Sequence, residues 1–148
     1  MSNDDYTKMQ TKLAEQQKVT DDELIKKYLT EKNLVAEKTT DGLYYIIEKK
    51  GTGDNAVAGK EVMVLYSGML LNGTVFDSSE KNGGQPFSVK IGAHSVIQGW
   101  DEGLTYFNKG ASGKLIIPSN LAYGEKEYPG RIPANSVLIF QIEVKDIK

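Results

Sequence analysis

Short runs rich in β-forming residues, separated by glycine turns, fill the sequence from Asp41-Gly42 onward, and this pattern limits the fold more than any other feature. Valine, isoleucine, tyrosine and phenylalanine are typical of strands, and glycine pairs between such runs are typical of tight turns. The runs expected to hold strands are 42–50, 60–71, 74–79, 85–92, 111–119 and 135–147. The Asn72-Gly73 pair between two of them is a hairpin signal. We therefore expect an antiparallel sheet of about five strands.

One segment between these runs, VIQGWDEGLTYFN at 96–108, has helical spacing instead. Its large apolar residues recur at intervals of three or four and share one face: Ile97, Trp100, Leu104 and Phe107. Gly99 and Gly103 lie inside this helix, although glycine in a helix interior costs about 1 kcal/mol relative to alanine. Ser95 followed by Gln98 has the pattern of a capping box and predicts a helix start at Ser95. One short helix on an antiparallel sheet indicates the α+β class.

The first 36 residues contain neither glycine nor proline and are expected to form one or two short amphipathic helices. Thr20 followed by Glu23 is a capping box, which predicts a helix start, and Asn33 is a plausible left-handed stop. An apolar stripe follows Thr20 at helical spacing: Leu24, Ile25, Tyr28 and Leu29. The chain therefore divides into a helical extension, 1–36, and a β-rich domain, 37–148. The stripe is expected to contact a second copy or a client protein, or else to pack back on the sheet.

Composition excludes several classes of protein. The formal net charge is −2 with both signs interspersed, and every basic residue except Arg131 is lysine, so no nucleic-acid partner is expected. The chain has no cysteine, and His94 is its only histidine, so neither a thiolate nor a multi-histidine metal site is expected. We expect His94 to be a loop residue. We expect no cofactor.

Hydropathy and the opening segment indicate where in the cell the protein is expected. No apolar run approaches the roughly 20 residues that a membrane helix needs, so no membrane span is expected. The opening segment, MSNDDYTKMQ, is polar throughout. A cytoplasmic protein is therefore expected from the sequence as it stands, and a periplasmic or cell-envelope protein if a leader has been removed.

Aromatic residues are spread over the β segments, the helix and the loop at 120–135: Tyr66, Phe76, Phe87, Trp100, Tyr123, Tyr128 and Phe140. On spacing alone, an aromatic core is the simpler interpretation. Tyr123 and Tyr128, however, lie in a loop with glycine and proline, where side chains are usually exposed. Rings that converge from sheet, helix and loop can also line an apolar cleft. Both interpretations stay open on these residues.

Four stretches carry a family resemblance in order along the chain: VLYSGMLLNGTVFDSS, SVIQGWDEGL, LIIPSNLAYGE and PGRIPANSVLIFQIEV. They resemble the successive motifs of the FKBP-type peptidyl-prolyl cis-trans isomerases, in a bacterial-like form with a short N-terminal helical extension. The match runs from about residue 42 to residue 148. The resemblance implies a half-wrapped antiparallel sheet around one short helix, with an aromatic pocket between them. It also places the helix start about two residues after Ser95.

Site residues follow from this resemblance. The residues at catalytic positions are Tyr66, Phe76, Asp77, Trp100, Tyr123 and Phe140. Those at further substrate-binding positions are Phe87, Val96, Ile97, Tyr128 and Ile132. Trp100 would form the pocket floor, and Asp77 would be hydrogen-bonded to Tyr66. Gly99 and Gly103 are then explained if they let the helix lie close to the sheet and hold the indole beneath a ligand.

The resemblance implies a function and partners. The implied function is cis–trans isomerisation of X-Pro bonds in protein substrates, which assists folding. The alternative is a chaperone or proline-peptide binding module without turnover. Binding of a macrolide inhibitor and homodimerisation through the N-terminal helices are further implied. The loop EKNGGQPF lacks the arginine that eukaryotic prototypes carry after the FDSS motif, which is expected to loosen the contacts of Asp77 and to weaken macrolide binding.

Overall fold

A computed structural model of the chain describes residues 2–124 and 132–148, apart from the side chains of residues 81 and 82. A long helix, α1 (Asn3–Glu31), precedes a sheet of seven antiparallel strands within these residues. The strands are β1 (Glu37–Lys38), β2 (Tyr44–Lys49), β3 (Glu61–Leu70), β4 (Val75–Ser78), β5 (Phe87–Lys90), β6 (Ser112–Ile117) and β7 (Leu138–Ile147). The second helix, α2 (Gln98–Gly103), follows β5 and precedes β6 along the chain. Short 3₁₀ turns are η1 (Ser79–Asn82), η2 (Leu104–Tyr106) and η3 (Ser119–Leu121).

The strands lie in the order β1-β2-β6-β7-β3-β4, with β5 also paired to β3. The expected α+β class and the half-wrapped sheet around a short helix are confirmed. Each of the runs expected to hold a strand does hold one. The expected number of strands, about five, is lower than the seven observed. One reason is that β1 has only two residues, both exposed, so it leaves no periodicity in the sequence.

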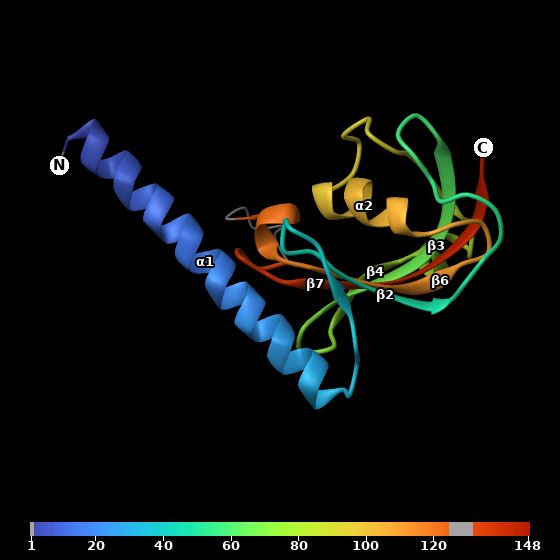
Figure 1. The fold of residues 1–148 in the computed structure, drawn as a ribbon, viewed down its shortest axis with the longest axis horizontal. Coiled ribbons are helices and arrows are strands. Elements are labelled where there is room, and N and C mark those ends of the chain that lie inside the picture. The colour runs from blue at the N-terminus through green and yellow to red at the C-terminus, as the bar shows by residue number, and fades with distance from the viewer. Residues whose placement is uncertain (1, 125–131) are drawn as a thin grey trace.

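The centre of the sheet is buried on both faces. On β6 and β7, Leu115, Ile117 and Phe140 belong to one apolar cluster with α2, whereas Ile116 and Ile139 belong to a second with α1. This alternation is the period of a β-strand. Figure 1 shows α2 on one side of the sheet and α1 on the other.

Helix α2 lies unusually close to the sheet because two glycines face it. A Cβ added at Gly99 would lie 2.6 Å from Cγ2 of Ile117, and one added at Gly103 would lie 2.6 Å from Cδ2 of Leu115. Real Cβ atoms do not approach neighbours so closely. The two glycines therefore fix the height of α2 above β6, as expected from their positions in the sequence.

The start of α2 differs from the capping-box prediction at Ser95. The helix begins at Gln98, Ile97 is its N-cap in an extended conformation, and no side chain caps it. The placement implied by the family resemblance, about two residues after Ser95, is correct to within one residue. Ser95 instead lines a cavity together with Val96 and Ile97, so the segment before the helix is used to present side chains and not to extend the helix.

Residues 3–31 form one continuous helix, so the predicted start at Thr20 is wrong. The Thr20 hydroxyl donates back to the carbonyl of Gln16, as threonine does inside a helix. The predicted stop is confirmed: Asn33 has φ of 54°, and the N–H of Leu34 donates to the carbonyl of Leu29. Of the helices in the described part of the chain, none is long and apolar enough to cross a membrane.

The C-terminal half of α1 packs back on the sheet, which was one of the two expectations for the apolar stripe. Ile25, Tyr28 and Leu29 are buried against Tyr44, Ile116 and Ile139. Leu24, the fourth residue of the stripe, stays exposed. The N-terminal half of the helix extends away from the body of the molecule (Figure 1), and its large apolar residues are exposed: Tyr6, Met9 and Leu13.

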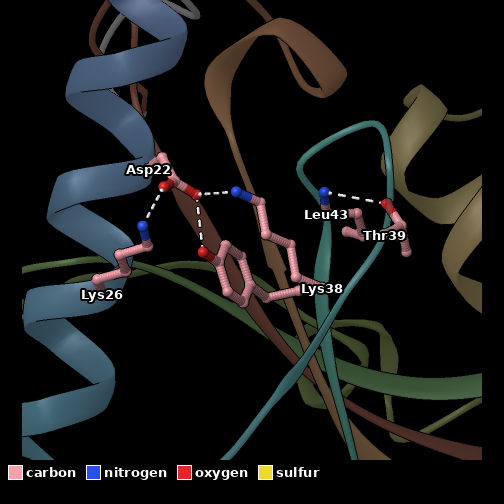
Figure 2. Close-up of polar contacts among 6 residues, drawn as sticks. Asp22, Lys26, Lys38, Thr39 and Leu43 are labelled. Atoms are coloured by element: carbon pink, nitrogen blue, oxygen red, sulfur yellow. Dashed lines mark hydrogen bonds and ion pairs between the residues drawn. The ribbon is translucent and has the colours of Figure 1, made fainter.

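A polar cluster around Asp22 holds α1 to the first two strands (Figure 2). Asp22 accepts a hydrogen bond of 2.7 Å from the Tyr44 hydroxyl and pairs at 3.0 Å with both Lys26 and Lys38. Burial alone would raise the pKa of Asp22, but the hydrogen bonds from Tyr44, Lys38 and Lys26 outweigh it and lower this pKa to about 2. The ionised carboxylate is therefore the form that stabilises the docked helix.

Gly99→Ala should destabilise the protein, although alanine is the better helix former by about 1 kcal/mol. The new methyl group would collide with Ile117, and overpacking of this kind costs about 1–3 kcal/mol. Urea unfolding measures the loss. In an Ile117→Ala background, where the colliding atoms are absent, the same substitution should cost much less. An equal cost in both backgrounds would mean that the contact with β6 is not the cause.

Asp22→Asn should lower the free energy of unfolding near neutral pH, by about 1–2 kcal/mol. Because the pKa of Asp22 is lower in the folded protein than the usual value near 4, its contribution is present above pH 4 and is lost as the pH falls toward 2. Urea unfolding of both proteins between pH 7 and pH 2 should show their difference shrinking over that range. Glu15→Gln is the matched control, since its exposed pair with Lys18 should contribute little. A difference independent of pH would contradict the assignment.

Candidate functional site

A cavity of about 210 Å³ opens between α2, the sheet and the loop after η3. The lining comes from four strands, β3, β4, β5 and β7, from α2 and the segment just before it, and from the loop after η3. The lining residues are Tyr66, Phe76, Asp77, Phe87, Ser95, Val96, Ile97, Trp100, Tyr123 and Phe140. Nine of these positions are ones that the family resemblance had indicated. The cleft interpretation of the aromatic residues therefore holds for this part of the chain, although the rings of Phe76, Trp100 and Phe140 also belong to the core cluster.

Trp100 lies at the centre of the aromatic residues and is only 3% exposed. Its ring meets those of Tyr66 and Phe140 nearly at right angles, with centroids 5.0 and 5.2 Å away. Phe76 in turn meets Phe140 at 5.6 Å, also edge to face. Such contacts fix ring orientation beyond simple apolar packing. The indole is thus held rigidly by α2 from one side and by the sheet rings from the other.

Asp77 is the only carboxylate that lines the cavity among the described residues. The Tyr66 hydroxyl donates to Oδ2 of Asp77 at 2.7 Å, and the backbone N–H of Ser78 donates to Oδ1 at 2.9 Å. This confirms the expected bond between Asp77 and Tyr66. Burial raises the pKa of Tyr66 well above its usual value, and the bond to Asp77 raises it further. Tyr66 therefore stays protonated, and its bond to Asp77 persists, throughout the neutral range.

The segment before α2 presents backbone as well as side chains. Among the described residues, no acceptor receives the N–H of Ile97, whereas its carbonyl accepts from Trp100 and Asp101 in the first turn of the helix. Asp101 reaches back and accepts the N–H groups of Gly92 and His94, each at 3.2 Å. The segment is therefore fixed at both ends, and the Ile97 N–H is left without an acceptor among the described residues.

The loop after η3 brings Tyr123 to the cavity, where its side chain is 38% exposed. Ile132, expected at the pocket, is buried in the same apolar cluster as Trp100 and is not among the residues that line the cavity. Tyr128 lies outside the described residues. The proposed roles of both in substrate binding stay predictions. His94 is a loop residue next to the cavity wall, as expected, with its side chain 90% exposed.

Sequence reasoning missed two residues that shape the cavity, Gly68 and Ser95. A Cβ at Gly68 would lie 2.7 Å from Phe140 and 2.8 Å from Phe76, so only glycine lets these rings close over β3. A glycine in the middle of a strand is a recognised sign of close approach by another group. That signal was present in LYSGML. Ser95 was not predicted as a cavity residue because its spacing from Gln98 indicated a helix cap instead.

Comparisons with known proteins agree with this geometry. The chain is 47% identical over 137 residues to the FKBP-type peptidyl-prolyl cis-trans isomerase FkpA of Buchnera aphidicola subsp. Baizongia pistaciae, which covers 93% of this chain and 52% of that protein. It is 44% identical to FK506-binding protein 1 of Dictyostelium discoideum, over 72% of this chain and 99% of the other. The crystal structure of FkpA from Escherichia coli superimposes with a TM-score of 0.76 at 36% identity, over 96% of this chain and 64% of that one.

The chain spans about half the length of the FkpA relative from Buchnera that it matches. The sequence pattern of the family described as FKBP-type peptidyl-prolyl cis-trans isomerase matches residues 52–145, which include every strand from β3 to β6, most of β7, and the whole cavity lining. Helix α1 lies before this match. The division at residues 36 and 37 stays a prediction. With the match, the fold and the cavity in agreement, the chain belongs to the FKBP-type peptidyl-prolyl cis-trans isomerase family.

Proposed function

We propose that this protein catalyses cis–trans isomerisation of X-Pro bonds in polypeptides and so assists their folding. The observation that carries the proposal is the cavity itself: a small apolar space closed by Trp100 and three phenylalanine rings, with the Asp77–Tyr66 pair on its wall. A proline ring is apolar and compact, and it suits such a space. The adjoining peptide carbonyl is polar and needs the groups along the wall.

The barrier to this reaction, about 18–20 kcal/mol, arises because rotation breaks the resonance of the amide. The twisted bond loses double-bond character, and its carbonyl carries a smaller dipole than the planar ground state. A pocket that removes water from the bond therefore disfavours the planar form more than the twisted one. Rotation forms and breaks no covalent bond, so neither a nucleophile nor a proton donor is required.

Each group at the cavity has a role in this proposal. Trp100, Phe87 and Phe140, with the ring of Tyr66, would enclose the proline ring. The N–H of Ile97 and the hydroxyl of Tyr123 would bind the substrate backbone and hold one side of the bond while the other rotates. Asp77, held by Tyr66, would set the electric field at the rotating carbonyl.

Kinetics on a short X-Pro peptide test the proposal. The protein should accelerate cis-to-trans conversion in proportion to its concentration, and a proline-limited refolding reaction should be accelerated as well. A Phe140→Ala variant, once circular dichroism confirms its fold, should lose most of this rate because one wall of the proline site is gone. Peptide binding without acceleration would instead support the alternative, a binding or chaperone module without turnover.

Asp77→Ala should lower kcat/KM about 10-fold, which corresponds to about 1.4 kcal/mol, the scale of a hydrogen bond to a charged group. Because no proton is transferred and Tyr66 stays protonated, the loss should be nearly the same from about pH 6 to pH 8. Asp54 is exposed, and Asp54→Ala, the matched control, should leave the rate unchanged. A steep titration of activity in this range would point to acid–base catalysis and contradict the mechanism.

We propose also that a macrolide can occupy the same pocket. The support is the 44% identity to a relative whose name states that it binds FK506, together with the shared pocket positions. Added FK506 should then slow peptide turnover in competition with the peptide. The loop after β4 lacks arginine, so we expect weaker inhibition than in the eukaryotic prototypes.

We propose further that two copies associate through the outer half of α1. Tyr6, Met9 and Leu13 are spaced three and four residues apart, share one face of the helix and are each about half exposed. A stripe of this kind is covered when two helices pack together. The inner half of the helix is already covered by the sheet and is not part of this surface.

Sedimentation velocity over a range of concentrations should show dimers of the full chain. A Met9→Glu, Leu13→Glu double variant should be monomeric, because a dimer interface would bury the new charges, and its short-peptide turnover should be unchanged. Thr7→Glu, Thr11→Glu on the same exposed half is the matched control and should still form dimers. A monomeric full chain at every concentration would overturn the proposal.

A further inference from the structure

Asp21 is a fully buried carboxylate that lies on α1, outside the cavity. It is 0% exposed, and no basic side chain among the described residues pairs with it. Three donors satisfy it instead. The Ser119 N–H and hydroxyl donate to Oδ2 at 2.8 and 2.5 Å, and the Gln17 side-chain amide donates to Oδ1 at 2.8 Å. A buried polar group needs such partners, and here they join α1 to η3 by hydrogen bonds in addition to apolar packing.

The Ser119 contact continues as a chain of backbone hydrogen bonds into the loop that carries Tyr123. The carbonyl of Ser119 accepts the N–H of Ala122 at 3.0 Å and that of Gly124 at 2.8 Å. The carbonyl of Gly124 then accepts the N–H of Asn135 at 2.7 Å, which ties the two ends of the loop together. Tyr123 lies between the two amides that Ser119 holds.

Contacts other than those of Asp21 also dock α1 on the sheet. The neighbouring Asp22 holds the helix to β1 and β2, and Ile25 packs it on the sheet one turn later. Asp21 is the residue whose carboxylate bonds directly to the turn that leads to Tyr123. The two adjacent aspartates thus serve different elements: Asp22 the strands, Asp21 the base of the loop.

We propose that Asp21 is a positioning residue for the pocket: through Ser119 it holds the base of the loop at the position from which Tyr123 reaches the substrate. This rests on the proposed isomerase function of the same cavity. It gives the N-terminal helix, which lies before the matched family region, a part in setting the active geometry. The helix is then more than a surface for association.

Peptide kinetics on the full chain test the proposal. Asp21→Ala should lower kcat/KM about 3- to 10-fold, within the range expected when one hydrogen bond to the substrate is lost. Asp21→Asn keeps an oxygen that can accept the Ser119 N–H and should recover part of the rate. Ile25→Ala is the matched control: it removes packing of the same helix on the sheet but leaves Ser119 untouched. An equal loss of rate in Ile25→Ala would overturn the proposal, since helix packing alone would then explain it.

A double-mutant cycle separates positioning from general damage. If Asp21 acts through Tyr123, then Asp21→Ala should change the rate less than about 2-fold in a Tyr123→Phe background. Full additivity of the two losses would contradict the proposal. Should Asp21→Ala fail to fold, Ser119→Ala removes only the hydroxyl bond and should show a smaller loss with the same non-additivity.

Hydrogen exchange provides a measurement that does not depend on turnover. The amides of Gly124 and Asn135 should exchange faster in Asp21→Ala, whereas those of β3 should not, because only the loop base is released. Unchanged exchange at Gly124 and Asn135 would overturn the proposal. If the wild-type protein accelerates no peptide, the proposed isomerase function fails, and the exchange result still decides whether Asp21 holds the loop.

Discussion

The close approach of α2 to β6 is the constraint on which the rest of the site depends. With no side chain at Gly99 or Gly103, the helix can lie directly on Ile117 and Leu115. That height brings Trp100 into contact with rings from β3 and β7 and determines the depth of the cavity. A helix with alanine at these places would be more stable in isolation, yet it would lie farther out. Local helix stability is given up for a tertiary contact that builds the pocket.

A glycine within the sheet allows a second close approach of the same kind. Gly68 leaves room on β3 for the rings of Phe76 and Phe140, which close the pocket from the side opposite α2. The polar groups are then added where the apolar walls stop. Asp77 is fixed by a hydroxyl and a backbone amide, and the Ile97 N–H is presented by a segment that Asp101 holds. Rigid walls and few polar groups are the general design of small ligand sites.

Much of the fold could be predicted because β-strands and their turns leave a local pattern. Alternate residues at 137–140 face opposite sides of the sheet: Leu138 and Phe140 belong to the cluster with α2, and Val137 and Ile139 to the cluster with α1. The two capping-box predictions failed for a common reason: the same residues can satisfy other partners. Thr20 bonds within a continuous helix, and Ser95 lines the cavity. The pocket residues came from the family resemblance, since spacing alone favoured a plain aromatic core. The contact of Asp21 with Ser119 joins residues 98 positions apart and has no local signature.

Helix α1 also fixes a length scale. The stretch of α1 from Asn3 to its first buried residue, Asp21, is about 27 Å long, at 1.5 Å per residue. An extended polypeptide needs about eight residues to cover that stretch, at about 3.3–3.6 Å per residue. A chain that touches both the outer helix and the body must therefore do so with segments well separated in its own sequence. If such a chain is a substrate of the proposed isomerase, its two weak contacts would reinforce each other through effective concentration, and long unfolded chains would be retained longer than short peptides.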